Sequence, residues 1–366
     1  MKCVAFDLGK VLFDFDYNIA LEKIKDKVGV DISYIIDALF YKDFAGDFER
    51  GEVGALDFYN KFKRAFKADI SFEEFKSIWC EIFWPKEDVI EFLERLRTVY
   101  PIYLISNINE LHFFYLYKKF SSVFSLFDDL ILSFKVKATK PDIKIYEELK
   151  KITALSYREI IYIDDREDLV DEAKNLELNT IKFNSLKELI PQLEKYSIFC
   201  PSRKETDILL ELKKHIKNSK NTLLIGMGNR LRSDDMVGSS IIEALDGRLT
   251  IETLDVKESL ENYLGRIKAS HSSLVIFLDS AYYNEEERFR LFSPSQLQDH
   301  FYLTHDSSLH FVVKYLQKDN SFDILLVGIK GYDFFLGETM SKETLKGKYI
   351  LENFFMRNFC KDNKVK

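Results

Sequence analysis

Short apolar runs rich in β-branched and aromatic residues alternate with longer stretches of helical spacing along the whole chain. This alternation is typical of α/β folds, in which helices connect the strands of a mostly parallel sheet. The runs of the first half predict strands over Lys2–Phe6, Ile102–Ile105, Asp129–Ser133, Glu159–Ile163 and Thr180–Phe183. Those of the second half predict strands over Thr222–Met227, Thr250–Leu254, Leu274–Leu278, Arg288–Phe292 and Asp323–Ile329. We therefore expect an α/β fold with two parallel-sheet, three-layer domains.

A long insertion separates the first two predicted strands. From about residue 17 to residue 97 the apolar residues follow helical spacing, as in Phe58, Phe62 and Phe66, and no segment there makes a good strand. A helical insertion after the first strand of a parallel sheet predicts a helical cap domain.

The chain of 366 residues is too long for one ordinary core. A helix over Ser185–Tyr196 is predicted to close the first half, and Pro201-Ser202-Arg203 mark a boundary. We assign residues 1–198 to a first domain, 199–221 to a linker with a helix over Thr206–Lys217, and 222–366 to a second domain. Further helices are predicted over Val237–Leu245, Leu260–Ala269, Ser308–Gln317 and Ser341–Phe359. The two halves share no motif, so we expect a fusion of unlike domains.

Composition and charge exclude several classes of protein. With 53 basic and 60 acidic residues the net charge is −7, so no general basic field favours nucleic acid or anionic lipid. No apolar run approaches the roughly 18 residues that a membrane span needs, which predicts no membrane insertion. An acid occurs as early as Asp7, which argues against a signal peptide. The four cysteines are scattered without a CxxC pair, so we expect a reduced, cytoplasmic protein.

Four polar clusters stand where predicted strands of the first domain end or the next helix begins. They are Asp7, Ser106-Asn107, Lys140-Pro141-Asp142 and Asp164-Asp165. In a parallel α/β sheet the carboxyl ends of the strands face one crevice, so these groups are expected to converge. Asp7 could attack phosphorus, magnesium held by the acids could screen the charge repulsion, and Ser106 and Lys140 could bind phosphate oxygens. An acid that ends a strand is commonly only a helix cap or turn former, but the ordered set favours phosphoryl chemistry.

With these residues the first half resembles the haloacid dehalogenase (HAD) superfamily over about residues 1–196. The most similar subgroup has a small helical cap and shares Phe6-Asp7-Leu8-Gly9-x-Val11 and Phe48-Glu49-Arg50-Gly51-Glu52. The resemblance implies a Rossmann-like HAD fold and a phosphatase that acts on a small phosphorylated metabolite. The roles it implies are nucleophile for Asp7, motif-two hydroxyl for Ser106, motif-three lysine for Lys140, and magnesium ligands for Asp7, Asp164 and Asp165.

Two positions depart from the HAD pattern. Gly9 stands where the usual second aspartate supplies the general acid/base, although members of this subgroup often carry glycine. Leu169 stands where the motif-four loop usually carries asparagine. Asp14 and Asp16 could replace the missing acid, but they are better explained as caps at the exit into the cap domain.

A glycine turn followed by two acids carries the main signal of the second domain. Gly226 and Gly228 permit a tight turn after a strand, and Asp234-Asp235 follow, where they would repel a pyrophosphate and favour a cation. Asp279 follows the apolar run Leu274–Leu278, and His305 precedes a predicted helix. Carboxylate and imidazole donors suit nickel, zinc or another divalent metal, although Asp279 could be a cap and His305 a surface loop residue.

These residues resemble the hydrogenase maturation endopeptidases over about Thr222 to Phe359. The shared pattern is Gly226-x-Gly228-Asn229-x-Leu231-x-x-Asp234-Asp235, Asp279-Ser280 and Thr304-His305. The resemblance implies Asp235, Asp279 and His305 as nickel ligands and a structural role for Asp234, as a helix cap or behind the ligands. Met236 departs from the glycine that usually follows the acids.

Such endopeptidases trim a C-terminal peptide from the precursor of a [NiFe]-hydrogenase large subunit after nickel insertion. The resemblance therefore implies a processing endopeptidase, with that precursor as partner and its nickel as the recognised metal, fused to a HAD-type phosphatase. Two alternatives stay open: a phosphatase with a vestigial partner-binding C-terminal domain, and an assembly scaffold that binds nickel-loaded precursor without cutting it.

Overall fold

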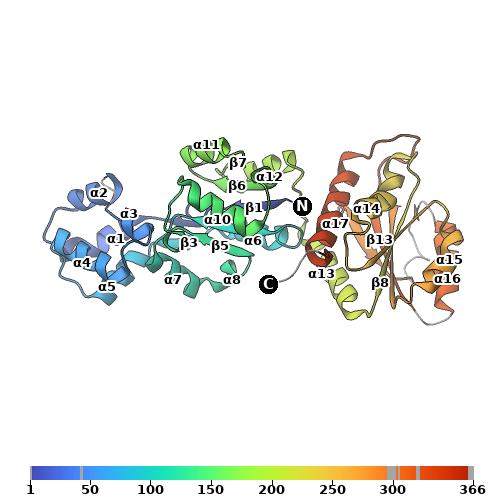
Figure 1. Ribbon diagram of the computed structural model, residues 1–366, viewed down its shortest axis with the longest axis horizontal. Coiled ribbons are helices and arrows are strands. Elements are labelled where there is room, and N and C mark those ends of the chain that lie inside the picture. The colour runs from blue at the N-terminus through green and yellow to red at the C-terminus, as the bar shows by residue number, and fades with distance from the viewer. Residues whose placement is uncertain (1, 42–43, 295–301, 304–305, 319–321, 362–366) are drawn as a thin grey trace. The chain divides into compact units, whose positions relative to one another are not determined.

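The computed structural model describes residues 2–41, 44–294, 302–303, 306–318 and 322–361. The chain forms two compact units, one of Met1–Arg97 with Pro101–Gln192 and the other of Thr98–Tyr100 with Leu193–Lys366 (Figure 1). Among the described residues, no helix combines the length and apolarity needed to cross a membrane.

The first unit is built on a five-stranded parallel sheet. Its strands, in the spatial order β5-β4-β1-β6-β7, are β5 (Asp129–Leu132), β4 (Ile102–Ser106), β1 (Cys3–Phe6), β6 (Ile160–Asp164) and β7 (Asn179–Lys182). The connecting helices are α6 (Glu87–Leu96), α7 (Glu110–Lys119), α8 (Ser121–Phe124), α9 (Ser133–Val136), α10 (Ile143–Thr153), α11 (Glu167–Asn175) and α12 (Leu186–Lys195). All five predicted strands are present, each shifted by at most one residue at either end.

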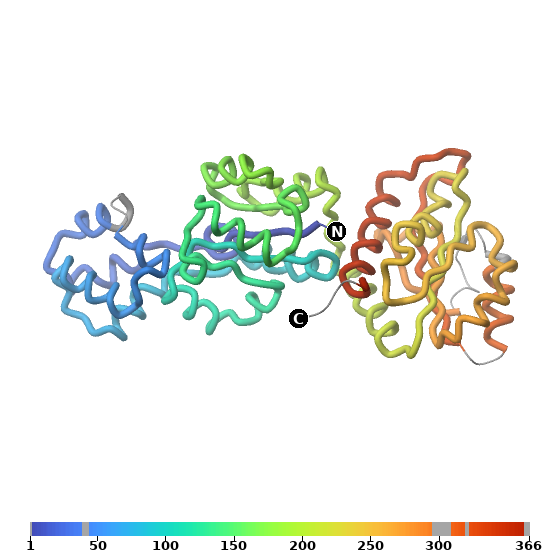
Figure 2. Tube along the Cα trace, in the orientation of Figure 1, coloured from blue at the N-terminus to red at the C-terminus, as the bar shows by residue number. Residues whose placement is uncertain are grey.

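The helical insertion forms its own aromatic core. It contains α1 (Tyr17–Ile24), α2 (Ile32–Tyr41), α3 (Gly46–Glu49), α4 (Ala55–Phe66) and α5 (Phe72–Cys80), and it is the blue segment set apart from the sheet in Figure 2. Phe58, Phe62 and Phe66 of α4 are buried against Phe75 and Trp79 of α5.

The borders of the insertion differ from the sequence prediction in two respects. A short antiparallel pair, β2 (Phe13–Phe15) with β3 (Phe83–Pro85), brackets the cap helices, although no strand was expected between residues 17 and 97. The buried residues of α6, which that range included, do not belong to the aromatic core of the cap. The cap helices therefore end before β3.

The second unit has a mixed six-stranded sheet that is mostly parallel. The spatial order is β11-β13-β10-β8-β9, with β12 paired to β10. β8 (Thr222–Met227), β9 (Glu252–Lys257), β10 (Leu274–Tyr282) and β13 (Asp323–Lys330) run parallel, whereas β11 (Phe289–Phe292) and β12 (Tyr302–Leu303) are antiparallel to their neighbours. The α/β prediction is confirmed for both units, and the antiparallel strands are an addition to it.

Helices cover both faces of this second sheet. Figure 1 shows α14 (Val237–Leu245) and α17 (Lys342–Phe359) on one side and α15 (Leu264–Ala269) and α16 (Asp306–Gln317) on the other. Leu309, Val312 and Leu316 of α16 are fully buried against the apolar residues of β8, β10 and β13. This burial follows from their helical spacing.

The predicted linker helix is α13 (Arg203–Asn218), and it packs within the second unit. A capping box with Ser202 begins it, and Glu205 of its first turn is buried. The Glu205 carboxylate accepts hydrogen bonds from Arg288 N at 2.7 Å, Arg288 Nε at 2.9 Å and Arg288 Nη2 at 2.6 Å. The ion pair fixes α13 to the segment that enters β11.

Glu205→Ala is expected to lower the free energy of unfolding of the second unit by about 3 kcal/mol, because it leaves the Arg288 guanidinium buried without its carboxylate. Glu211→Ala on the same helix is the control, since Glu211 is exposed and should contribute less than about 0.5 kcal/mol. The change in the free energy of unfolding is measured by urea unfolding of the full chain, monitored through hydrogen exchange of the backbone amides in α13 and β13. Equal unfolding midpoints for Glu205→Ala and the wild type would contradict this role.

Candidate active sites

Asp7 lies directly after the central strand β1, at the carboxyl end of the first sheet. Its N–H donates to Ile163 O at 2.9 Å, which continues the pairing with β6 beyond the strand. Asp7 is 8% exposed. The β1 backbone therefore holds Asp7 beside the end of β6, where Asp164 and Asp165 follow.

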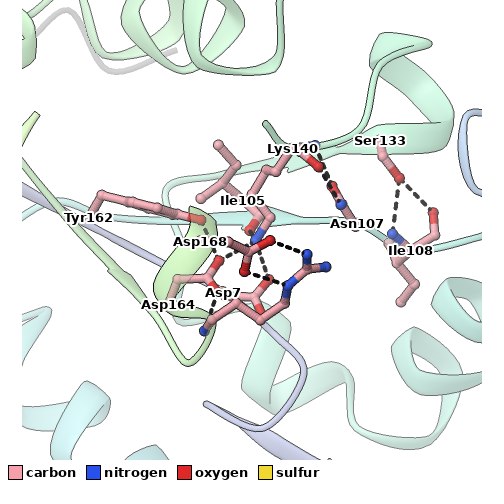
Figure 3. Close-up of polar contacts among 10 residues, drawn as sticks. Asp7, Ile105, Asn107, Ile108, Ser133, Lys140, Tyr162, Asp164 and Asp168 are labelled. Atoms are coloured by element: carbon pink, nitrogen blue, oxygen red, sulfur yellow. Dashed lines mark hydrogen bonds and ion pairs between the residues drawn. The ribbon is translucent and has the colours of Figure 1, made fainter. Parts of the chain in front are cut away.

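Lys140 joins the acids of this site (Figure 3). Its buried Nζ donates to Asp7 Oδ1 and to Asp164 Oδ2, both at 2.6 Å, and to Ile105 O at 3.2 Å. Asn107 holds the backbone of Lys140 from both sides, since Lys140 N donates to Asn107 Oδ1 at 2.7 Å and Asn107 Nδ2 donates to Lys140 O at 3.0 Å. The ends of β1, β4 and β6 thus meet at one ammonium group.

Three carboxylates form a cluster with the chemistry of a divalent-metal site. Ligand oxygens of Asp7, Asp164 and Asp165 all lie within 4.8 Å of one another. Oxygen donors at this separation suit a hard cation such as Mg²⁺, which is usually held by one or two carboxylates and completed by water and phosphate oxygens. The residues present therefore fit magnesium.

Burial and the neighbouring charges shift the pKa values of the ionisable groups in this site. Burial raises the pKa of Asp7 to about 7, against the opposing effect of the Lys140 ammonium and together with the negative charge of Asp164. Burial also raises the pKa of Asp165, and the charge of Asp164 adds to the shift. For Lys140 burial acts to lower the pKa, but Asp7 and Asp164 outweigh it and hold the pKa above its ordinary value. A cation would relieve the repulsion among the three acids.

The other predicted residues of the first unit occupy defined places. Ser106 is the last residue of β4 and is buried at the same sheet end as Asp7. Leu169 is buried on α11. The sequence shows Asn107 beside Ser106 but does not indicate its role in fixing Lys140.

The space beside Gly9 is filled by an aromatic ring. A Cβ at residue 9 would lie 3.1 Å from Phe15 Cε1, so an acid there would require Phe15 to move. Asp14 instead accepts from Lys10 Nζ and from Phe15 N, and Asp16 caps α1 by accepting from Asn18 N at 2.8 Å. The two acids therefore stabilise the exit into the cap, as the sequence indicated.

The end of α3 and the start of α4 in the cap are tied to residues that follow β4 and β5 at the same sheet end. Ser133 Oγ, directly after β5, donates to Glu49 O at 2.7 Å and accepts from Ile108 N at 2.9 Å. Glu110 Oε1 accepts from Ala55 N, the first residue of α4, at 2.6 Å. The cap is thereby docked next to the polypeptide that follows Ser106 and Asn107, a contact that the sequence did not reveal.

In the second unit the glycine turn brings Asp235 against β10. Asp235 Oδ2 accepts from Asn229 N at 3.0 Å, and its Oδ1 accepts from Ser280 Oγ at 3.2 Å. Ser280 N in turn donates to Asp279 Oδ1 at 2.9 Å. Asp235 and Asp279 are both buried, and both hydrogen-bond to Ser280, Asp235 to its hydroxyl and Asp279 to its backbone amide. The two predicted ligands therefore share Ser280 as a hydrogen-bond partner.

Two close backbone approaches explain the glycines around this turn. Gly228 has φ +139°, and a Cβ there would lie 2.0 Å from Asp235 O. A Cβ at Gly238 in α14 would lie 2.1 Å from Leu278 O in β10. Any larger residue would push Asp235 or α14 away from the strands.

Asp234 has a different role from its neighbour. Its Oδ2 accepts from Tyr332 N at 2.7 Å and Asp333 N at 2.9 Å, and its Oδ1 accepts from Ser341 N at 2.6 Å. It therefore fixes the loop between β13 and α17. The structural role predicted for it is present, through a loop distant in sequence rather than through the first helix.

Two other details of the second site concern Asp279 and His305. Asp279 is predicted to end its strand, but β10 continues to Tyr282, because residues 279–281 pair with β13 and Ala281 and Tyr282 pair with β12. His305, the third predicted ligand, lies outside the described residues.

Comparisons with known proteins find two separate similarities, the first in the N-terminal half. Residues 1–176 match the family model of the haloacid dehalogenase-like hydrolases. A D-ribitol-5-phosphate phosphatase of Bacteroides thetaiotaomicron is 24% identical over 189 residues, which cover 50% of this chain and 91% of the relative. A HAD family enzyme from the same species, solved as a magnesium complex, is 23% identical with a TM-score of 0.47 and covers 52% of this chain and 98% of its own.

The second match falls on a different class of hydrolase. A protein of Methanocaldococcus jannaschii named "Putative hydrogenase maturation protease" is 24% identical over 129 residues, which cover 31% of this chain and 75% of the relative. The chain thus joins a haloacid dehalogenase-like hydrolase domain in its N-terminal half to a C-terminal part similar to hydrogenase maturation proteases.

Proposed function

We propose that the N-terminal unit is a magnesium-dependent phosphatase that hydrolyses a small phosphomonoester. The observation that carries this proposal is the arrangement of Lys140 between Asp7 and Asp164, with Asp165 in the same carboxylate cluster. At the carboxyl end of the sheet it supplies a nucleophile, an ammonium group that can bind phosphate oxygens, and a set of carboxylates for a metal ion.

In the proposed mechanism Asp7 attacks phosphorus, the bond to the substrate alcohol breaks, and an aspartyl-phosphate forms. Ser106 and Lys140 bind the phosphoryl oxygens and stabilise their charge during transfer. Magnesium held by Asp7, Asp164 and Asp165 supplies further charge stabilisation when bound. Water then hydrolyses the aspartyl-phosphate, and phosphate leaves with Asp7 restored.

The affinity for magnesium is expected to depend on pH. Because the pKa of Asp7 is raised to about 7, its carboxyl group holds a proton at pH 6 that a bound cation must displace. We expect about tenfold weaker Mg²⁺ binding at pH 6 than at pH 8, measured by calorimetry on the full chain. The same affinity at both pH values would contradict this assignment, and Asp7→Asn should show a flatter dependence.

For the C-terminal unit we propose endopeptidase processing of a nickel-loaded [NiFe]-hydrogenase large-subunit precursor. Asp235 and Asp279 support it because both are buried carboxylates that hydrogen-bond to Ser280, and His305 would add an imidazole. Oxygen and imidazole donors match a borderline cation such as the nickel of the substrate. Cleavage of purified precursor by the full chain tests the proposal.

A further inference from the structure

Tyr162 is a buried tyrosine whose hydroxyl contacts Asp164, one of the proposed magnesium ligands. It lies in β6 two residues before Asp164, so the two side chains leave the same face of the sheet. Its ring packs edge-on against Tyr146 of α10, with ring centroids 5.7 Å apart. A buried tyrosine hydroxyl needs a polar partner, and that of Tyr162 donates to Asp164 Oδ2 (Figure 3).

One carboxylate oxygen of Asp164 accepts more hydrogen bonds from the described residues than the other. Oδ2 accepts from the Tyr162 hydroxyl and from Lys140 Nζ, whereas Oδ1 accepts only from Arg166 N, at 2.9 Å, among the hydrogen bonds of the described residues. A carboxylate oxygen offers about two acceptor positions. Oδ2 is therefore filled, and Oδ1 keeps capacity for a cation.

The geometry points to Tyr162 as a positioning residue that orients Asp164 for metal binding, an inference that rests on the proposed magnesium site. Lys140 alone does not fix Asp164, because the same ammonium also serves Asp7 and Ile105 O. The single proton of the Tyr162 hydroxyl is donated to Asp164 Oδ2, and the Tyr146 hydroxyl also interacts with this hydroxyl. It therefore fixes Oδ2 within the protein and leaves Oδ1 with capacity to accept a cation.

Tyr162→Phe tests this role with little disturbance of the core, because it keeps the ring that packs on Tyr146 and removes only the hydroxyl. Free Mn²⁺, followed by electron paramagnetic resonance during titration of the full chain, measures metal affinity without any substrate. We expect about tenfold weaker binding than in the wild type, the size typical of losing a group that orients a metal ligand. Mg²⁺ competition should give the same shift.

A second readout separates positioning from general structural damage. With p-nitrophenyl phosphate as probe, the Mg²⁺ concentration for half-maximal activity should rise about tenfold, while the rate at saturating Mg²⁺ stays within about threefold of the wild type. Tyr157→Phe removes a hydroxyl from a residue packed against the same core cluster, and it should bind Mn²⁺ like the wild type.

The outcomes are distinguishable. Unchanged Mn²⁺ affinity in Tyr162→Phe, with weakened affinity in Asp164→Asn, overturns the inference about Tyr162 and leaves the metal site standing. Equal affinity in the wild type and Asp164→Asn would instead overturn the proposed site itself, and with it the basis of the inference.

Discussion

Asp7→Asn is expected to reduce phosphate release by at least about a thousandfold, because the amide cannot attack phosphorus and the other groups at the site cannot replace it. Release of inorganic phosphate from a panel of small phosphomonoesters, with and without Mg²⁺, measures the loss. The aspartyl-phosphate should also be absent after acid quenching of the variant and present in the wild type. Turnover at the wild-type rate by Asp7→Asn would remove Asp7 from the mechanism.

The same variant should be more stable than the wild type in metal-free buffer at pH 8. The pKa of Asp7 is raised in the folded chain, so its ionisation costs stability as the pH rises from about 4, the unfolded value, through about 7. Asn removes that cost, and its advantage should shrink when the pH is lowered from 8 to 5. Thermal unfolding at both pH values checks the sign. If Asp7→Asn gains less stability over the wild type at pH 8 than at pH 5, the raised pKa assigned to Asp7 is contradicted.

Asp235→Ala, Asp279→Ala and His305→Ala are each expected to stop C-terminal trimming of the nickel-loaded large subunit. Loss of one ligand from such a set should weaken metal capture by about one to two orders of magnitude or more. The mass of the large subunit in cells that carry each variant reports the effect. A mature large subunit with Asp235→Ala would refute the proposed nickel site.

Two controls make this experiment specific. His310 lies near the predicted ligand His305 in sequence, and His310→Ala should leave trimming intact. Asp234→Asn keeps a polar side chain beside Asp235 but weakens the hydrogen bonds to Tyr332 N, Asp333 N and Ser341 N. It should lower the stability of the second unit more than the rate of cleavage per folded molecule.

Much of the N-terminal site could be predicted because its residues follow strands with clear apolar runs. The parallel sheet brings the ends of β1, β4 and β6 together, so Asp7, Lys140 and Asp164 meet although they are far apart in sequence. The contribution of Tyr162 was not visible, since a tyrosine within an apolar strand indicates only a core residue.

The sequence did not reveal three other features, because their residues form no recognisable sequence pattern. β2 and β3 have three residues each, too few to show an alternating pattern. Asp279 and Ser280 interrupt the apolar run of β10, which made the strand look shorter than it is. The partners of Asp234 are backbone amides about a hundred residues away, and backbone groups leave no trace in the sequence.

Incubation of the purified chain with nickel-loaded large-subunit precursor, followed by intact-mass measurement, tests the central claim most directly. We predict loss of a C-terminal peptide from the nickel-loaded precursor and no change in precursor without nickel. A precursor of unchanged mass, bound stoichiometrically to a chain whose phosphatase activity is intact, would contradict the endopeptidase assignment and favour a scaffold that holds the precursor without cutting it.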